Sequence, residues 1–163
     1  EVANIKLVRI DFRLIHGQVV NKWIKITLSN KIIVIDDTLA ANEFMRSVYA
    51  MAAPPGVDVL IYGEDEAVSK WKENQFGDGN VLILFKSVKA AHKCYMKGFN
   101  FEELQIGGLG ASPGRKIVFG PITLDQADAD ELKEIQDKGA RVYFHQVPED
   151  GSAELSKILE KFK

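Results

Sequence analysis

The sequence predicts an α/β fold in which helices cover both faces of a mostly parallel sheet. Short apolar segments alternate with amphipathic segments, a pattern typical of strand–helix–strand units with right-handed crossovers. The apolar segments are nearly continuous in Val, Ile and Leu, which indicates strands that are covered on both faces. The 163 residues suffice for one substantial core, and no linker or repeat divides them. We therefore expect residues 1–163 to form a single domain.

The first half of the chain contains four strand-like segments, each followed by a helical pattern. The strands are expected at Ile5–Ile10, Ile32–Asp36, Val57–Tyr62 and Val81–Phe85. Helices are expected at about residues 17–28, 40–52, 65–73 and 88–97.

The last third of the chain has a different arrangement. The segments "LQIGGLG" and "RKIVFGPI" are separated only by Ala111–Gly114, which is too short for a crossover helix. These two strands are therefore expected to form an antiparallel hairpin within the sheet. Thr123 or Asp125 is expected to cap a helix that closes at Gly139. A seventh strand at Arg141–Val147 and a closing helix at Ser152–Phe162 complete the predicted elements.

Composition argues against several classes of function. A net charge of −2 with 27% charged residues offers no basic surface for nucleic acid. Apolar runs such as Val81–Phe85 are far too short to cross a bilayer, and no secretory signal is expected. The single Cys94 rules out an internal disulfide and suits a reducing compartment. We therefore expect a cytoplasmic protein that binds no nucleic acid and does not insert into the membrane.

The histidines and the cysteine do not indicate a metal site. His92 and Cys94 lie two positions apart on one predicted helix, so they point to different faces. His145 alternates within a predicted strand and is expected to be a packed or edge residue. Because this spacing matches no familiar ligand set, neither a metal nor a cofactor is expected.

The loop after the first strand carries the strongest functional signal. Functional groups in open α/β sheets collect at the carboxyl ends of parallel strands, where this chain places Asp11, Arg13 and His16. His16 lies at or just before a predicted helix start, where free N–H groups and the helix dipole favour an anion and disfavour an imidazolium. Arg13 can grip phosphate oxygens, and Asp11 can orient either the arginine or the ring. These residues suit a histidine that accepts a phosphoryl group.

Simpler interpretations remain open for this loop and for its neighbours. His16 can be a helix cap or a surface residue, and an Arg–Asp pair can be purely structural. Asp37, after the second strand, either pairs with Arg13 or caps the next helix together with Asp36. Ser87 is the natural N-cap of the helix after the fourth strand. The segment "GGLGASPGR" suits either an anion or tight turns, and neither GxxxxGK[ST] nor GxGxxG follows any strand.

The segment "RIDFRLIHGQVV" resembles a family signature, "RIDDRLIHGQV". This signature belongs to the B component of enzyme II in the mannose–sorbose–fructose family of the bacterial phosphoenolpyruvate:sugar phosphotransferase system. Further segments are similar to that family in the same order, namely "VIDDTLAANEFMR", "APPGVDV", "VLILFKS", "IGGLGASPGRK" and "GARVYFHQVP". The resemblance covers essentially the whole chain. It implies a seven-stranded α/β sheet with one antiparallel strand and helices on both faces.

The resemblance also implies an activity and partners. The family's B component takes a phosphoryl group from a phosphohistidine of the A component and passes it to a sugar held by the membrane C and D components. The carrier histidine corresponds to His16, phosphorylated on Nδ1, and Arg13 corresponds to the phosphate clamp. Asp11 and Asp37 match the family's acidic residues. The partners would recruit the protein to the inner face of the plasma membrane, and a homodimer is left open.

The mechanism expected from this resemblance begins when neutral His16 attacks the phosphohistidine of the A component in line, without a metal or cofactor. Arg13, the backbone N–H groups at Gly17 and Gln18, and Ser87 are the expected phosphate contacts. Phe12 departs from the signature, which has an aspartate there, so Asp11 and Asp37 are the expected orienters of Arg13. Two rival functions remain: a non-catalytic anion- or ligand-binding regulatory domain, and a hydrolase that uses His16 with Asp11.

Overall fold

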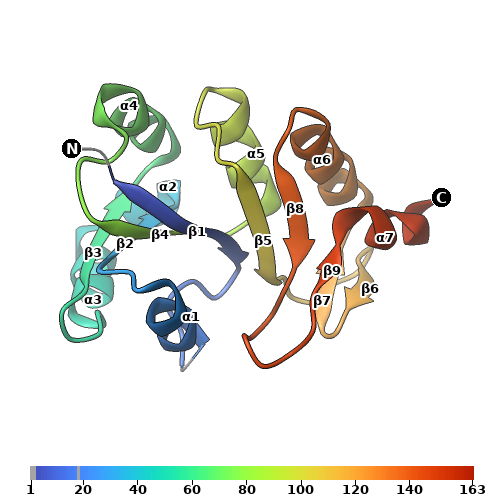
Figure 1. Cartoon of the computed structure of the whole chain (residues 1–163), viewed down its shortest axis with the longest axis horizontal. Helices are drawn as coiled ribbons and strands as arrows, with labels where there is room; N and C mark the ends of the chain where they lie inside the picture. Colours follow the sequence, from blue (N-terminus) through green and yellow to red (C-terminus); the bar gives the residue numbers. More distant parts are fainter. Residues whose placement is uncertain (1–2, 18) are drawn as a thin grey trace.

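The computed structural model describes residues 3–17 and 19–163 and contains a seven-stranded main sheet (Figure 1). The strand order is β3-β2-β4-β1-β5-β8-β9. Its strands are β1 (Asn4–Asp11), β2 (Lys31–Ile35), β3 (Asp58–Tyr62), β4 (Asn80–Phe85), β5 (Glu103–Gly108), β8 (Arg141–Phe144) and β9 (Ala153–Glu154). The strands pair in parallel except β9, which is antiparallel to β8. The predicted mostly parallel sheet with one antiparallel strand is confirmed.

Helices cover both faces of this sheet. Those described are α1 (Val19–Thr27), α2 (Asp37–Ala40), α3 (Glu43–Met51), α4 (Glu64–Asn74), α5 (Val88–Met96), α6 (Gln126–Asp137) and α7 (Leu155–Leu159), which continues as a 3-10 turn (Glu160–Phe162). In Figure 1, α4, α5 and α6 lie on one side of the sheet, and α1 and α3 on the other. The helix predicted at 40–52 is α3 and starts later than expected, because Asn42 accepts a hydrogen bond from the Met45 N–H and caps it; the short α2 precedes it.

The predicted hairpin between "LQIGGLG" and "RKIVFGPI" is wrong. The first segment forms β5, which is buried along nearly its whole length and runs parallel to both β1 and β8. The second forms β6 (Lys116–Phe119), which pairs antiparallel with β7 (Ile122–Leu124) in a separate two-stranded sheet. The short connection between them leaves the main sheet instead of reversing within it, so it needs no crossover helix.

The helix boundaries follow the expected capping chemistry. Asp125 caps α6 by accepting a hydrogen bond from the Asp128 N–H, and Gly139 follows the helix with φ +121°, as a C-terminal glycine requires. Asp36 caps α2 by accepting from the Leu39 N–H. These contacts confirm Asp125, rather than Thr123, as the cap of α6.

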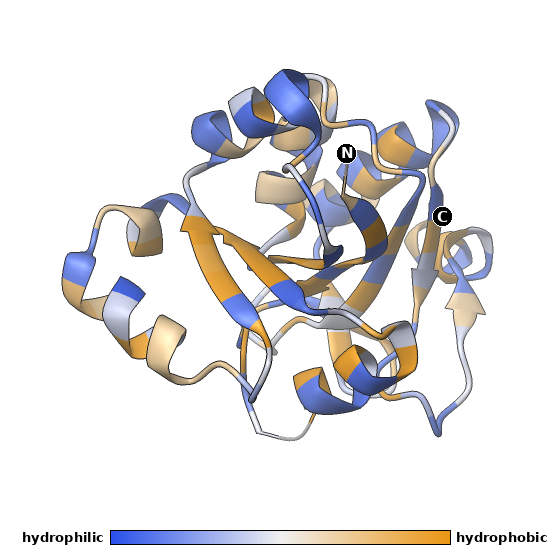
Figure 2. Cartoon of the chain, turned by 60° about the vertical axis from the view of Figure 1, so that its left-hand side comes forward, coloured by the Kyte–Doolittle hydropathy of each residue, from blue (hydrophilic) through white to orange (hydrophobic). Residues whose placement is uncertain are grey.

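The apolar strands separate two hydrophobic clusters. One cluster lies under α4, α5, α6 and α7, and the other lies under α1, α2 and α3. Strands β2 and β4 supply side chains to both clusters, and their apolar residues from Ile32 to Ile35 and from Val81 to Phe85 are almost completely buried. Figure 2 shows the same arrangement, with hydrophobic strands in the middle and helices of mixed hydropathy around them. None of the helices in the described part of the chain is long and apolar enough to cross a membrane.

Candidate functional site

The β1–α1 loop turns back on itself directly after the sheet. Leu14 adopts the left-handed conformation with φ +58°, and its N–H donates to the Asp11 carbonyl over 2.9 Å. A left-handed leucine is sterically unfavourable, but the buried side chain packs into the cluster beneath α1, which holds the turn. Gly17, with φ +47°, continues the turn. The turn brings the His16 ring back to the end of β1.

The Asp11 carboxylate is the centre of the site. It is almost completely buried, and each of its oxygens accepts two hydrogen bonds. Oδ1 accepts from the backbone N–H of Arg13 over 3.1 Å and from its Nε over 3.3 Å. Oδ2 lies 3.0 Å from Nε2 of His16 and 3.2 Å from Nη2 of Arg9. The structure therefore brings together the three residues that the sequence singled out.

These contacts keep Asp11 ionised despite its burial. Burial raises the pKa of the carboxyl group. The hydrogen bond with His16, the positive charge of Arg9 and the N–H of Arg13 lower it by more than burial raises it. The net result is a pKa below the ordinary value of an aspartate. An ionised carboxylate can only accept hydrogen bonds, so Nε2 of His16 must carry the proton. The lone pair of a neutral ring then lies on Nδ1.

The Nδ1 atom of His16 is the available nitrogen. Among the described residues it has no hydrogen-bond partner, and the side chain is about one-fifth exposed. The described part of α1 begins at Val19, so His16 lies three positions ahead of it. Gln18, which the sequence suggests as a phosphate contact, lies outside the described residues.

Arg13 extends toward solvent from the same carboxylate. Its side chain is 39% exposed, so part of the guanidinium can reach another anion while Nε remains on Asp11. Its Cζ lies 5.4 Å from the centre of the Phe12 ring, within the range of a cation–π contact. The Phe12 ring in turn packs over Gly110, where an added Cβ would lie 3.3 Å from the ring. Phe12 thus occupies a defined place between Arg13 and the loop after β5.

Sequence reasoning missed Arg9 as a site residue. Its guanidinium is buried and donates to Asp11, to the side chain of Gln105, and to the carbonyl oxygens of His145 and Gln146. A charged residue inside an otherwise apolar strand was the available signal, since such a residue is rarely buried without partners. The identity of those partners depends on β5 and β8, which lie far away in the sequence.

Two expected site residues have other contacts. Asp37 does not pair with Arg13: its Oδ1 accepts the Glu64 N–H over 2.7 Å, at the start of α4. The ion pair that Arg13 makes within the described residues is with Asp11. The alternative interpretation, capping of the next helix, holds for Asp36, which caps α2, but not for Asp37, which lies within α2 and bonds to the start of α4. Ser87 caps α5 through the Ala90 N–H over 3.1 Å, as expected, at the carboxyl end of β4, next to β1.

The other histidines and the cysteine have structural surroundings. His92 lies between Glu131 and Glu134 of α6, and His145 packs edge-on against Trp23 of α1. Cys94 is buried, which raises the pKa of its thiol to about 12. No group of three or more potential metal ligands occurs within residues 3–17 and 19–163.

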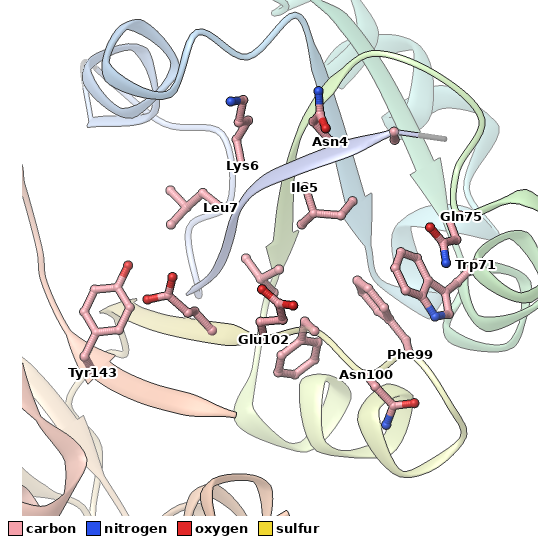
Figure 3. Close-up of a pocket in the computed structure, with 14 residues that line it drawn as sticks. Asn4, Ile5, Lys6, Leu7, Trp71, Gln75, Phe99, Asn100, Glu102 and Tyr143 are labelled. Atoms are coloured by element: carbon pink, nitrogen blue, oxygen red, sulfur yellow. The ribbon is translucent and has the colours of Figure 1, made fainter. Parts of the chain in front are cut away.

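A cavity of about 430 Å³ lies at the other end of β1 (Figure 3). It opens where β1 and β5 diverge at their amino-terminal ends, and Asn4, Ile5, Trp71, Phe99 and Tyr143 are among its lining residues. The Asp11–His16 contact lies at the opposite end of the same strand. The cavity is therefore separate from the candidate site.

Comparison with known proteins identifies relatives of the whole chain. The family model of the PTS system sorbose subfamily IIB component matches residues 5–163. The sorbose-specific EIIB component of Klebsiella pneumoniae is 33% identical over 157 residues, which cover 96% of each chain. The mannose-specific EIIAB component of Escherichia coli K12 is 26% identical over 157 residues, which cover 96% of this chain and 49% of that protein. The crystal structure of manxB from Thermoanaerobacter tengcongensis has a TM-score of 0.91 and 35% identity, with 99% of this chain and 98% of that chain covered.

The match to the family model runs from the first strand to the last residue, and the sorbose-specific relative covers the same length. The fold of the solved neighbour agrees over almost the entire chain. The chain therefore belongs to the sorbose-subfamily IIB components of the PTS, the phosphotransferase domains that act in sugar transport.

Proposed function

We propose that His16 accepts a phosphoryl group from the phosphohistidine of an A component and passes it to a sugar held by membrane C and D components. The observation that carries this proposal is the 3.0 Å contact between Asp11 Oδ2 and His16 Nε2. Because that contact engages Nε2, Nδ1 is the nitrogen that attacks phosphorus. The neutral ring attacks as a nucleophile, and the catalytic residues are His16, Arg13 and Asp11.

The electron balance of this step gives Asp11 a catalytic task. The Nδ1 lone pair forms the new N–P bond while the N–P bond of the donor breaks, and that electron pair returns to the donor's ring. Nε2 keeps its proton, so the newly phosphorylated His16 ring carries a positive charge. Asp11 stabilises this charged ring more strongly than the neutral one. Such a difference between reacting and ground states is what lowers a barrier.

The phosphoryl oxygens require donors on the solvent side of the loop. Arg13 is suited to this role because its guanidinium is partly exposed and its Nε is held by Asp11. The N–H groups of Gly17 and Gln18 and the hydroxyl of Ser87 are the further donors in the proposal. Positioning and electrostatic stabilisation of this kind account for most phosphoryl-transfer catalysis.

The proposed donor and acceptor follow from the family. One relative is named as a mannose-specific EIIAB component, which supports an A component as the partner. The names of the relatives include sorbose, mannose and fructose, so the proposal assigns no particular sugar. Recruitment to the inner face of the membrane would follow from binding the C and D components, and a homodimer stays a prediction.

Phosphate labelling tests the proposal. Incubation with the phosphorylated A component should place acid-labile ³²P on the wild-type chain and none on His16→Ala. His92→Ala is the matched control, because that ring lies between α5 and α6, and this variant should label like the wild type. Full labelling of His16→Ala would overturn the assignment.

The same experiment separates the rival functions. A binding or regulatory domain would gain no acid-labile phosphate from the A component. A hydrolase that uses His16 with Asp11 would release inorganic phosphate from a phosphoester without any partner protein. The residues of the loop favour a carrier over a hydrolase, because no serine or cysteine nucleophile lies within the turn from Asp11 to Gly17.

A further inference from the structure

Arg9 is a buried cation directly behind the candidate site. Only 1% of the residue is exposed, although arginine is among the residues least often buried. It lies on β1 two residues before Asp11, so both side chains project from the same face of the strand, toward α1. Burial lowers the pKa of its guanidinium, and the charge of Asp11 counteracts that effect. A buried charge of this kind persists only where its hydrogen bonds are satisfied.

Four N–H groups of Arg9 meet four acceptors from three parts of the chain. Nη2 donates to Asp11 Oδ2 over 3.2 Å and to the Gln146 carbonyl over 2.9 Å. Nη1 donates to the His145 carbonyl over 3.0 Å and to Oε1 of Gln105. The guanidinium therefore connects β1, β5 and the loop after β8. It also lies 5.6 Å from the centre of the Trp23 ring, whose Nε1 donates to the same Gln146 carbonyl.

The sheet leaves a gap for this guanidinium at Gly107. A Cβ at that position would lie 1.9 Å from Cζ of Arg9, so any side chain there would have to displace the guanidinium from its place. At the next residue, Gly108, a Cβ would lie 2.8 Å from Oδ1 of Asp11. The two glycines at the end of β5 therefore accommodate the Arg9–Asp11 pair, which explains part of the glycine-rich segment without an anion.

We propose that Arg9 is a positioning residue for phosphoryl transfer, which holds Asp11 in the orientation that fixes the Nε2–H tautomer of His16. This inference rests on the proposed function of His16. Oδ2 is the shared atom, since it accepts from Arg9 on one side and from His16 on the other. Without Arg9, only the bonds from Arg13 to Oδ1 and from His16 to Oδ2 orient the carboxylate. The ring then exchanges between tautomers, and Nδ1 is less often the unprotonated nitrogen.

The planar fork of arginine is essential to this role. A lysine at position 9 keeps the charge but directs a single ammonium group, which cannot reach acceptors from three segments with fixed geometry. Arg9→Lys should therefore retain the fold with reduced stability, while the orientation of Asp11 loosens. Misplacement of a reacting group by about 1 Å lowers a rate by about a hundredfold. We therefore expect the single-turnover rate of phosphoryl acceptance to decrease by about ten- to a hundredfold.

Two readouts separate positioning from plain structural support. The ¹⁵N spectrum of the unphosphorylated His16 ring reports its tautomer, with no partner protein needed. The wild type should show the Nε2–H form, and Arg9→Lys a mixture of both forms. Single-turnover labelling should show the lower rate at saturating A component, so that weaker docking is not the cause. A variant with lower stability but an unchanged tautomer and rate would overturn the proposal.

A milder variant keeps the test decisive if Arg9→Lys does not fold. Gln105→Met removes one acceptor of Arg9 and should give a smaller shift toward mixed tautomers, with a rate lower by about fivefold, as expected for the loss of one hydrogen bond. Gln126→Met is its matched control, because Gln126 is exposed and its hydrogen bond among the described residues is to Asp130, within α6. If Gln105→Met gave the same ¹⁵N spectrum of His16 and the same labelling rate as its control, the positioning role of Arg9 would be overturned. A wild type that stays unlabelled while its ring is the Nε2–H form would instead contradict the proposed function.

Discussion

At the scale of single residues, the geometry of the site depends on how fully Asp11 is bonded. Two arginines and one histidine donate to a carboxylate with no exposed oxygen, so its direction is fixed before any substrate arrives. Preorganised charge of this kind needs no rearrangement during the reaction. Of the two arginines, Arg13 is the one that extends toward solvent, and it should therefore contact the phosphoryl group that His16 accepts.

Arg13→Ala should keep the fold and slow phosphoryl acceptance at least tenfold, about 1.4 kcal/mol of barrier. The side chain is 39% exposed, so its loss removes little packing. Arg46→Ala is the control, because that exposed arginine lies on α3, and its hydrogen bond among the described residues is to the Ala40 carbonyl, away from the site. Single-turnover labelling measures both rates, and an unchanged rate for Arg13→Ala would exclude the clamp.

Asp11 should also contribute to the acid sensitivity of the fold. Its pKa in the folded protein lies below the ordinary value of 3.8, so ionised Asp11 stabilises the native state above pH 3.8. This stabilisation is lost as the pH falls through the lower folded value. Thermal melts from neutral pH downward should show a shallower acid-induced decrease for Asp11→Asn than for the wild type. If the melting temperatures of both proteins decreased in parallel with falling pH, another carboxylate would be responsible for the acid sensitivity.

At the scale of elements, β5 decides whether the site can form. Its buried residues were correctly predicted to form a strand, but its partners were not, because strand pairing depends on segments distant in sequence. The short Ala111–Gly114 connection favoured a hairpin from local information alone. Capping, in contrast, is local: Ser87 was predicted as a cap, and Asp36 and Asp125 were each among the alternatives that the sequence offered. The path of Arg9 across Gly107 could not be predicted, because it requires β1, β5 and β8 to be assembled.

Gly107→Ala should therefore destabilise the protein by about 2–3 kcal/mol, the range of a severe overpacking substitution. The new Cβ would overlap the Arg9 guanidinium, which four hydrogen bonds hold in place. Gly151→Ala is the matched control, since an added Cβ there has no heavy atom within 4 Å. This control should stay within about 0.5 kcal/mol of the wild type in chemical denaturation. Similar midpoints for both variants would contradict the described packing at Gly107.

At the scale of the whole molecule, stability is concentrated in the middle of the sheet. Strands β2 and β4 have almost completely buried apolar side chains and lie between two helical layers. Helix α3, in contrast, has no fully buried residue and exposes Phe44 and Met51. The alternation of strands and helices predicted this layered arrangement, because apolar strands need cover on both faces. The alternation did not predict that the apolar side chains of α3 would be so exposed, because their spacing in the sequence resembles that of a helix packed on a core.

Native-state hydrogen exchange should reflect this difference. Amides of β2 and β4 should exchange at rates close to those set by global unfolding, while amides of α3 exchange through local opening. The measurement is the denaturant dependence of exchange, which should be steep for the two strands and shallow for α3. Equal protection of α3 and β4 would show that the helix is held by contacts other than those described.

The long reach of Arg9 also affects the order in which the protein is completed. Every expected catalytic residue lies within the first 17 positions, yet the Arg9–His145 bond joins residues separated by 136 positions. Closing so long a loop costs entropy that only the finished sheet repays. A chain still emerging from the ribosome thus contains Asp11, Arg13 and His16 long before Arg9 has its last two acceptors. The site is assembled late, although it is encoded first.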